Sequence, residues 1–278
     1  MYRKLDMQEI KNKANHVRKD MVDVAVKNGA GHIAPSLSTV DILTALYYRV
    51  MNISQDPKWE ERDRLIFSKA HGCYALYAIL ADIGYIGREE WEKFYKGSIL
   101  QGCVERDVER GLEASCGSLG HGLPQAVGIA FGAKIQNRKY RTYCIVGDGE
   151  MQEGSNWEAI QFAVKHKLAN LTVIIDNNTL QAMNFLKNVL TPEERDDDLK
   201  IKMEAFGFEV STCNGHNPKE IIDIIERWKR AQGTTGRPQG LIAKTIKGYG
   251  LICMENVPEF HFRIPNEKEL EMGKRYEC

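Results

Sequence analysis

The sequence predicts an α/β protein whose doubly wound, mainly parallel sheet carries helices on both faces. Through the second half of the chain, short apolar runs rich in β-branched residues alternate with longer amphipathic stretches. This alternation is typical of parallel strands joined by crossover helices that cover both faces of the sheet. The sequence contains no internal repeat, low-complexity tract or Pro/Gly-rich linker. We therefore expect residues 1–278 to form a single domain.

The first half of the chain is expected to be mainly helical. Residues 7–28 form an amphipathic pattern that ends at Asn28-Gly29, and Ser38 and Thr39 are suitable capping residues for a second helix over 39–52. The next expected elements are a strand over 63–68, helices from Gly72 and over 88–97, a charged loop over 98–120 and a helix over 122–136.

The second half is expected to contain the regular alternation. The predicted strands are residues 142–147, 171–177, 208–213 and 240–246. The predicted helices are residues 153–168, 197–206 and 218–231. The crossovers between these parallel strands should be right-handed.

The composition argues against two classes of partner. Lys plus Arg and Asp plus Glu both number 38, so the net charge is zero, whereas nonspecific nucleic-acid binding needs a basic surface. No apolar run approaches the roughly 20 residues of a membrane-spanning helix. The first residues lack the apolar region of a secretory signal, and the seven cysteines are irregularly spaced. We expect a cytoplasmic protein with reduced thiols.

Polar residues follow two successive predicted strands. The first strand ends in Gly147-Asp148-Gly149, and the next ends in Asp176-Asn177-Asn178. The carboxyl ends of neighbouring parallel strands meet at one edge of the sheet, where ligands of open α/β sheets bind. A carboxylate and an amide oxygen there suit Mg²⁺, and the glycines let the backbone approach a phosphate closely. The pattern therefore predicts a Mg²⁺ site that holds a diphosphate.

The chain resembles the transketolase family. The family's thiamine diphosphate fingerprint resembles residues 147–178, GDGEMQEGSNWEAIQFAVKHKLANLTVIIDNN. Four further segments resemble transketolases in the same order: KNGAGHIAPSLSTVDILTALY, DRLIFSKAHGCYALYAIL, EASCGSLGHGLPQAVGIAFGAK and KTIKGYG with MENVPEFH. The resemblance covers nearly the whole chain and implies the thiamine-diphosphate-binding fold.

The resemblance also implies an assembly. A full transketolase is more than twice as long as this chain, and its second domain completes the cofactor site. By this resemblance the chain is the N-terminal subunit of a split, two-component transketolase. It should be active only with a C-terminal subunit, in a heterotetramer of two copies of each.

Roles of individual residues follow from the resemblance, position by position. The implied ligands of Mg²⁺ (or Ca²⁺ or Mn²⁺) are Asp148, Asn178 and the backbone carbonyl of Leu180. The implied contacts of thiamine diphosphate are His71, Gly117, Leu119, Gly149, Glu153, Asn178, Ile246 and His261, and Glu153 and Glu158 match residues that link paired active sites. The implied catalytic residues are His32, His71 and His261, and imidazole suits proton transfer near neutral pH.

The sequence departs from the family in the loop that precedes Gly117. The usual His-Pro-Glu is replaced by Val104-Glu105-Arg106, within a charged stretch that adds Arg106 and Arg110. Arginine binds anions in a bidentate manner, so we hypothesise a donor ketose with an acidic terminus such as a sulfonate. A solvated charged loop is the alternative.

Other histidines receive less specific predictions. His121 stands where many transketolases have Gln. A neutral imidazole can replace an amide as hydrogen-bond donor or acceptor, so we weigh a direct contact with substrate equally against no contact. We interpret His16 and His166 as surface or packing residues of helices and His216 as a turn residue. The family's Trp-His-Gly-Lys is here Phe260-His261-Phe262-Arg263, which has bulkier neighbours around the histidine.

The leading functional hypothesis is transfer of a two-carbon ketol unit from a ketose, phosphorylated or similarly acidic, to an aldose. One alternative is a component of another thiamine diphosphate enzyme, either similar to deoxyxylulose-phosphate synthase or decarboxylating a 2-oxo acid. A second is a non-catalytic regulatory component. A third, a different Mg²⁺-dependent phosphate enzyme, is disfavoured because no GxxxxGK[ST] or GxGxxG motif follows a strand.

Overall fold

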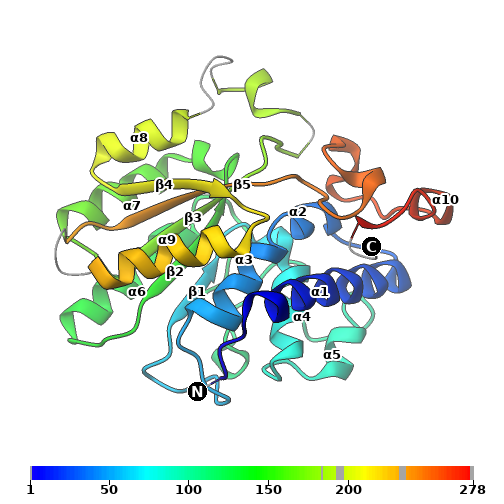
Figure 1. Ribbon diagram of the computed structural model, residues 1–278, viewed down its shortest axis with the longest axis horizontal. Helices are drawn as coiled ribbons and strands as arrows, with labels where there is room; N and C mark the ends of the chain where they lie inside the picture. Colours follow the sequence, from blue (N-terminus) through cyan, green and yellow to red (C-terminus); the bar gives the residue numbers. More distant parts are fainter. Residues whose placement is uncertain (1, 183, 192–196, 232–235, 276–278) are drawn as a thin grey trace.

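Five parallel strands form the centre of the protein, in the spatial order β1-β2-β3-β5-β4 (Figure 1). The computed structural model describes residues 2–182, 184–191, 197–231 and 236–275. The strands are β1 (Arg64–Phe67), β2 (Thr142–Gly147), β3 (Leu171–Asn177), β4 (Glu209–Asn214) and β5 (Gln239–Lys244). All four neighbouring pairs are parallel, so the predicted fold class is confirmed.

Helices cover both faces of this sheet. One layer consists of α6 (Gly122–Ile135), α7 (Gly154–Lys165) and α8 (Asp198–Phe206), which pack side by side against the strands. The other contains α9 (Pro218–Ala231), which packs on β4 and on α3 (Val40–Ala45). In Figure 1, α8 and α9 lie on opposite sides of β4. The strand order reverses where β5 inserts between β3 and β4, as a doubly wound sheet requires.

The N-terminal helices pack beside this second layer. They are α1 (Met7–Asn28), α2 (Ile33–Leu37), α4 (Cys73–Asp82) and α5 (Arg88–Glu92), and a short α10 (Glu267–Leu270) lies near the C-terminus. Helix α1 has the predicted bounds because Asp6 and Glu9 form a capping box and Gly29 ends the helix in a left-handed conformation. Helix α5 is shorter than the predicted 88–97.

The helix predicted over 39–52 is wrong in detail. The segment contains α3 and then a π-helical turn over Leu46–Val50, and the separate short helix α2 precedes it. The expected capping hydroxyls point backwards, since Ser38 donates to the carbonyl of Pro35 (3.1 Å) and Thr39 to that of Ser36 (2.9 Å). The single hydroxyl hydrogen of Ser38 is shared with the carboxylate of Asp176, which is closer at 2.7 Å, so Ser38 joins the helix boundary to the end of β3.

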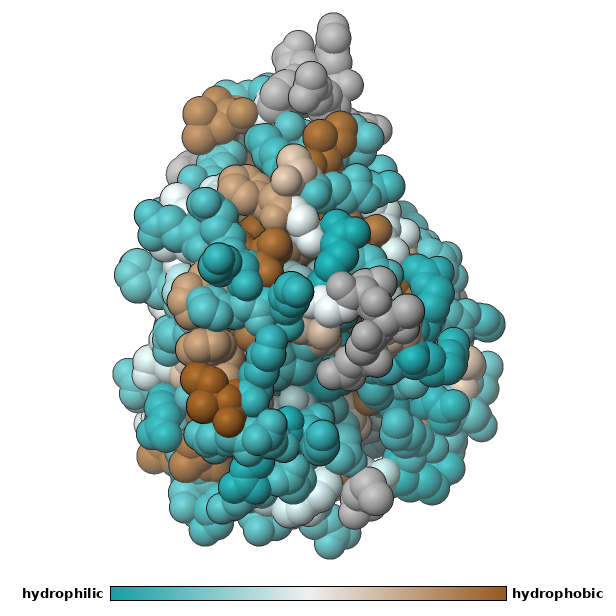
Figure 2. Space-filling model, turned by 90° about the vertical axis from the view of Figure 1, so that its left-hand side faces the viewer, coloured by the Kyte–Doolittle hydropathy of each residue, from teal (hydrophilic) through white to brown (hydrophobic). Residues whose placement is uncertain are grey.

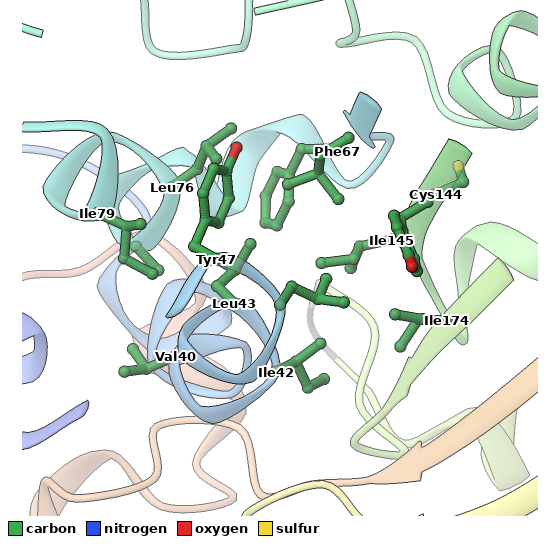
Figure 3. Close-up of a cluster of buried hydrophobic side chains, with 14 of the residues drawn as sticks. Val40, Ile42, Leu43, Tyr47, Phe67, Leu76, Ile79, Cys144, Ile145 and Ile174 are labelled. Atoms are coloured by element: carbon green, nitrogen blue, oxygen red, sulfur yellow. The ribbon is translucent and has the colours of Figure 1, made fainter. Parts of the chain in front are cut away.

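A continuous apolar core holds the strand ends in place. Figure 3 shows Ile42 and Leu43 of α3 directed toward side chains of the sheet, including Phe67 and Ile145. These side chains are at most 2% exposed. Six cysteines in the described part of the chain are free thiols. Because this core is close-packed, groups at the carboxyl ends of the strands have well-defined positions.

Candidate active site

Four strand ends bring distant segments together at the carboxyl edge of the sheet. Gly147 pairs with Asp176, and Asn177 pairs with Lys244, so the segments that follow β2, β3 and β5 leave the sheet side by side. Ser68 follows β1, and its backbone N–H donates to the carbonyl of Ile145 in β2 (2.8 Å). This is the edge at which the sequence places the diphosphate site.

Asp148 lies buried at this edge, with 4% of its surface exposed. Its carboxylate accepts hydrogen bonds from the backbone N–H groups of Gly149 (2.7 Å) and Thr179 (2.5 Å). Burial, followed by the nearby charge of Asp176, raises the pKa of Asp148 to about 7. A bound cation would supply the counter-charge that favours the ionised carboxylate.

Asn178 is oriented by Asp176. Its amide N–H donates to the Asp176 carboxylate (3.1 Å), and its amide oxygen accepts the backbone N–H of Leu180 (3.1 Å). The three predicted metal ligands Asp148, Asn178 and Leu180 therefore belong to one cluster of strand ends. Among the described residues, no group of three or more His, Cys, Asp or Glu side chains gathers as a metal site. The predicted set does not need one, since it combines a carboxylate, an amide and a carbonyl.

Three predicted histidines meet although they are far apart in the sequence. The ring centroids of His32, His71 and His261 are 5.1–5.2 Å from one another. They come from the start of α2, the segment after β1 and the 3₁₀ turn Pro258–His261. Phe262 packs edge-on against His32 at 4.7 Å, so the bulkier neighbour of His261 does contact the cluster.

These histidines are neutral at neutral pH. Burial and the positive charges of Lys247 and Lys69 lower the pKa of His32 to about 4. The same causes, with burial the largest, lower the pKa of His261 to about 3 and hold that of His71 well below its ordinary value. A neutral imidazole can accept a proton at one nitrogen and donate at the other, as proton transfer requires.

Two buried lysines complete the cluster, and the sequence reasoning missed both. Lys69 forms an ion pair with Asp176 and donates to the carbonyl of Pro35 (2.9 Å). Lys247 is 1% exposed and donates to the carbonyl of Gln181 (2.6 Å) and to Nδ1 of His261 (2.9 Å). Both lysines lie in segments that resemble transketolases, Lys69 two residues before His71 and Lys247 directly after Ile246, and this position was the available sequence signal.

Lys247 has two chemical consequences. Because its ammonium donates to Nδ1 of His261, the neutral ring carries its proton on Nε2. Burial, and secondly the charge of Lys69, lower the pKa of Lys247 to about 8. The depressed pKa indicates a site short of negative charge, and an anionic group such as a diphosphate would provide it.

The histidine cluster predicts how stability depends on pH. An unfolded histidine has a pKa of about 6.5, and the lower values of His32 and His261 mean that the folded protein binds fewer protons below that pH. The free energy of unfolding should therefore fall as the pH decreases from about 6.5 toward 4. Urea titrations at several pH values measure this dependence. In the double variant His32→Gln/His261→Gln, the free energy of unfolding should fall less steeply as the pH decreases than it does in the wild-type protein. The exposed His16→Gln serves as control, and an unchanged slope in the double variant would contradict the assignment.

Glu150 joins the loop before α6 to the strand ends, and the sequence reasoning missed it too. Its buried carboxylate accepts the hydroxyl of Ser68 and the backbone N–H groups of Gly120 (3.0 Å) and Gly147 (3.1 Å). Gly117 and Leu119 are exposed on this loop, Leu119 by 38%. A signal for Glu150 was available, because an acidic residue directly after a strand-end Gly-Asp-Gly is placed to bind backbone N–H groups.

The remaining predicted substrate residues are exposed or partly exposed. Arg106 is exposed, whereas Arg110 forms an ion pair with Asp107 of its own loop. His121 is exposed at the start of α6, and its Nδ1 lies 3.0 Å from the carbonyl oxygen of Leu119. Ile246 is half-buried just past the end of β5, where the predicted strand 240–246 proves two residues too long at its end.

The other histidines follow their predictions with one correction. His16 is exposed on α1, and His166 packs against Phe131 and Phe162, with ring centroids 4.7 and 4.2 Å away. His216 lies in a turn after β4, as predicted, but its side chain is 6% exposed and makes buried hydrogen bonds. The neighbouring Asn214-Gly215 predicts only a turn. The sequence could not indicate the buried hydrogen bonds of His216, because its partners lie in distant segments of the chain.

Comparison with known proteins identifies the family. Residues 10–275 match the family described as transketolase, thiamine diphosphate binding domain. The chain is 41% identical to a subunit of the apulose-4-phosphate transketolase of Actinobacillus succinogenes over 275 residues, which cover 97% of this chain and 96% of that relative. It is 38% identical to the 6-deoxy-6-sulfo-D-fructose transketolase subunit SqwG of Clostridium sp., over 87% of this chain and 86% of that relative.

A solved structure agrees with these matches. The transketolase of Campylobacter jejuni superposes with a TM-score of 0.85 at 30% identity, over 98% of this chain and 43% of that one. This chain thus spans less than half the length of that transketolase. The near-complete family match, together with relatives above 30% identity along most of their length, shows that the chain belongs to the transketolase family and comprises its thiamine diphosphate binding domain.

Proposed function

We propose that this chain is the N-terminal, thiamine diphosphate-binding subunit of a two-component transketolase. The enzyme transfers a two-carbon ketol unit from a ketose to an aldose. The observation that carries the proposal is the meeting of three neutral histidines and two buried lysines beside Asp148, in a chain that matches transketolase subunits over most of their length.

The proposed metal is Mg²⁺, with Ca²⁺ or Mn²⁺ as substitutes. Asp148, the amide oxygen of Asn178 and the carbonyl of Leu180 would bind it, a set of oxygen ligands suited to hard cations. The raised pKa of Asp148 supports this assignment, because the buried carboxylate lacks a counter-charge among its hydrogen-bond partners.

The proposed diphosphate contacts are the N–H of Gly149, His71, His261 and the ammonium of Lys247. The backbone at Gly149 runs under Gln181, and an added Cβ would come within 2.9 Å of that side chain. A larger residue at position 149 would therefore displace the Gln181 side chain, and glycine leaves the backbone here free of a side chain of its own. The rings of thiamine would lie against Gly117, Leu119 and Ile246.

The three histidines are the proposed catalytic residues. The chemistry that thiamine diphosphate supplies when bound is a thiazolium carbanion that attacks a carbonyl carbon and accepts the electrons of the broken carbon–carbon bond. His261 would donate through Nε2–H, since Lys247 occupies its Nδ1. His32 would act at the substrate hydroxyls, and the edge of Phe262 beside it narrows the space for substrate.

The proposed partners are a second copy of the chain and two copies of a C-terminal subunit, in a heterotetramer. Apolar side chains at the site rim support this assembly, because Leu119 and Phe262 are 38% and 53% exposed. Figure 2 shows further brown apolar patches on a mainly hydrophilic face, and exposed apolar residues of the helices include Ile135, Phe162 and Phe206. Glu153 and Glu158 are exposed at the start of α7, as an interface role requires.

We propose a cytoplasmic enzyme that acts on an acidic ketose. In the described part of the chain, no helix is both long and apolar enough to span a membrane.

The names of the two relatives state a phosphorylated and a sulfonated sugar, so both have an anionic substrate. Of the two loop arginines, Arg106 is the more available anion ligand, because Arg106 is exposed whereas Arg110 is paired with Asp107; His121 is also exposed.

Reconstitution tests the proposal. Co-expressed with its C-terminal subunit, the chain should transfer ketol units in the presence of thiamine diphosphate and Mg²⁺, whereas either component by itself should be inactive. The donor panel is xylulose 5-phosphate, fructose 6-phosphate, a 6-sulfo ketose and pyruvate. Release of CO₂ from pyruvate without ketol transfer would replace the proposal with a decarboxylating enzyme. A stable complex that binds the cofactor and transfers from no donor would indicate that the proposed donor class is wrong.

A further inference from the structure

A buried hydrogen-bond network lies behind the proposed cofactor site. Arg18 of α1 and His216 both contact the same carboxylate oxygen of Asp41 in α3, and the His216 Nδ1 is 2.9 Å from it. The three side chains are at most 6% exposed. The His216 ring also stacks on Tyr249, with centroids 3.6 Å apart. His216 is therefore held from two directions.

The other ring nitrogen of His216 is directed at the proposed site. The backbone N–H of Ile246 donates to Nε2 of His216 over 2.8 Å. A carboxylate partner at Nδ1 requires a proton there, so Nε2 is left as an acceptor, the tautomer that this bond needs. The network thus selects the tautomer as well as the position of the ring.

The Ile246 N–H lies just past the end of the sheet. The β4–β5 ladder ends at Asn214 and Lys244, and beyond it the N–H of Gly215 donates to the carbonyl of Lys244 (2.7 Å). If β4 were longer, one of its backbone carbonyls would accept the N–H of Ile246. Here Nε2 of His216 accepts this N–H instead. Without it, a partly buried backbone donor would lose its partner.

Ile246 is flanked by residues of the site on both sides. Thr245 donates its hydroxyl to Asp176, and Lys247 donates to Gln181 and His261. A displacement of the Ile246 backbone would therefore move the proposed thiamine contact and both neighbours together. The fixed bond from His216 prevents that displacement.

We infer that His216 is a positioning residue, which holds Ile246 against the thiamine rings through its Nε2 and is itself held by Asp41. The inference rests on the proposed function, because it assumes that Ile246 contacts the cofactor. It assigns a role in cofactor affinity to a residue that touches neither cofactor nor substrate.

Two amide variants test the inference in the assembled two-component complex. An asparagine amide reaches about as far as Nδ1, so His216→Asn keeps the bond to Asp41 and loses the acceptor for Ile246. A glutamine amide reaches about as far as Nε2, so His216→Gln keeps that acceptor. Both variants lose the stacking on Tyr249, which makes them matched controls for general loss of packing.

Two readouts are measured. Hydrogen exchange of the peptide that contains Ile246 should become at least about tenfold faster in His216→Asn and stay near wild type in His216→Gln, the factor expected for one lost hydrogen bond. The Kd of thiamine diphosphate should rise about tenfold in His216→Asn only, with kcat at saturating cofactor little changed. In a chain that already carries Ile246→Ala, His216→Asn should weaken the binding of thiamine diphosphate by less than it does in the wild-type chain, because both substitutions act on the same contact.

The outcomes separate the inference from the proposed function. The positioning role would be overturned if both variants kept the wild-type exchange rate and Kd. It would also be overturned if both variants lost protection and cofactor affinity equally, a result that would point to the stacking of the His216 ring on Tyr249 instead. Failure of the wild-type complex to bind thiamine diphosphate would overturn the proposed function, and with it the link from His216 to the cofactor.

Discussion

Substitution of Asp148 by asparagine is expected to abolish Mg²⁺-dependent binding of thiamine diphosphate and, with it, ketol transfer. The substitution keeps the shape of the side chain and removes the single carboxylate of the proposed metal site. Loss of a residue that only supports a metal ligand weakens metal affinity about 10–100-fold, so loss of a direct ligand should exceed about 100-fold. Titration of cofactor binding against Mg²⁺ in the assembled complex measures the effect.

The control for this substitution is Asp23→Asn. Asp23 is exposed on α1, and the change of charge is the same. Circular dichroism and assembly with the C-terminal subunit should be normal for both variants, because the side chain volume hardly changes. If Asp148→Asn bound Mg²⁺ and cofactor as tightly as Asp23→Asn, Asp148 would not be a metal ligand.

The largest expected loss of stability follows from Lys69→Met. Lys69 and Asp176 form a buried ion pair, with side-chain exposures of 3% and 0%. Burial alone would raise the pKa of Asp176, and Lys69 together with the hydroxyls of Thr245 and Ser38 holds it below the ordinary value. Removal of the lysine leaves a buried carboxylate without its cation, which costs about 3–5 kcal/mol. Urea unfolding at neutral pH measures the loss.

The double variant Lys69→Met/Asp176→Asn separates charge from packing. Asparagine removes the unpaired charge, and its amide can still bond to Ser38 and Thr245, so part of the stability should return. Should the single variant fail to fold, recovery of a folded double variant would give the same information. Equal destabilisation of the single and the double variants would mean that packing around Lys69, and not its charge, stabilises the strand ends.

The sequence alone determined the parts of the fold that depend on local pattern. The predicted bounds of β2 (Thr142–Gly147), β3 (Leu171–Asn177) and α9 (Pro218–Ala231) agree with the structure, because each is a strong periodic run with turn residues at its ends. The adjacency of Asp148 and Asn178 was also predictable, since consecutive parallel strands place their carboxyl ends at one edge. Family resemblance added roles for these two residues, and it alone pointed to the histidines at positions 32, 71 and 261.

Tertiary structure decided how the site is completed. The histidines at positions 32, 71 and 261 meet only after α2, β1 and the C-terminal segment have packed together. No role for Lys69 or Lys247 could be assigned from their own segments. The ion pair of Lys69 and the lowered pKa of Lys247 arise from burial beside groups distant in the sequence. His216 occupies an ordinary turn, and the break between α2 and α3 occurs where Ser38 reaches Asp176. Local patterns reflect hydrogen bonding and hydrophobic periodicity within a segment, whereas the pKa values, tautomers and partners of a site depend on which distant groups share its buried volume.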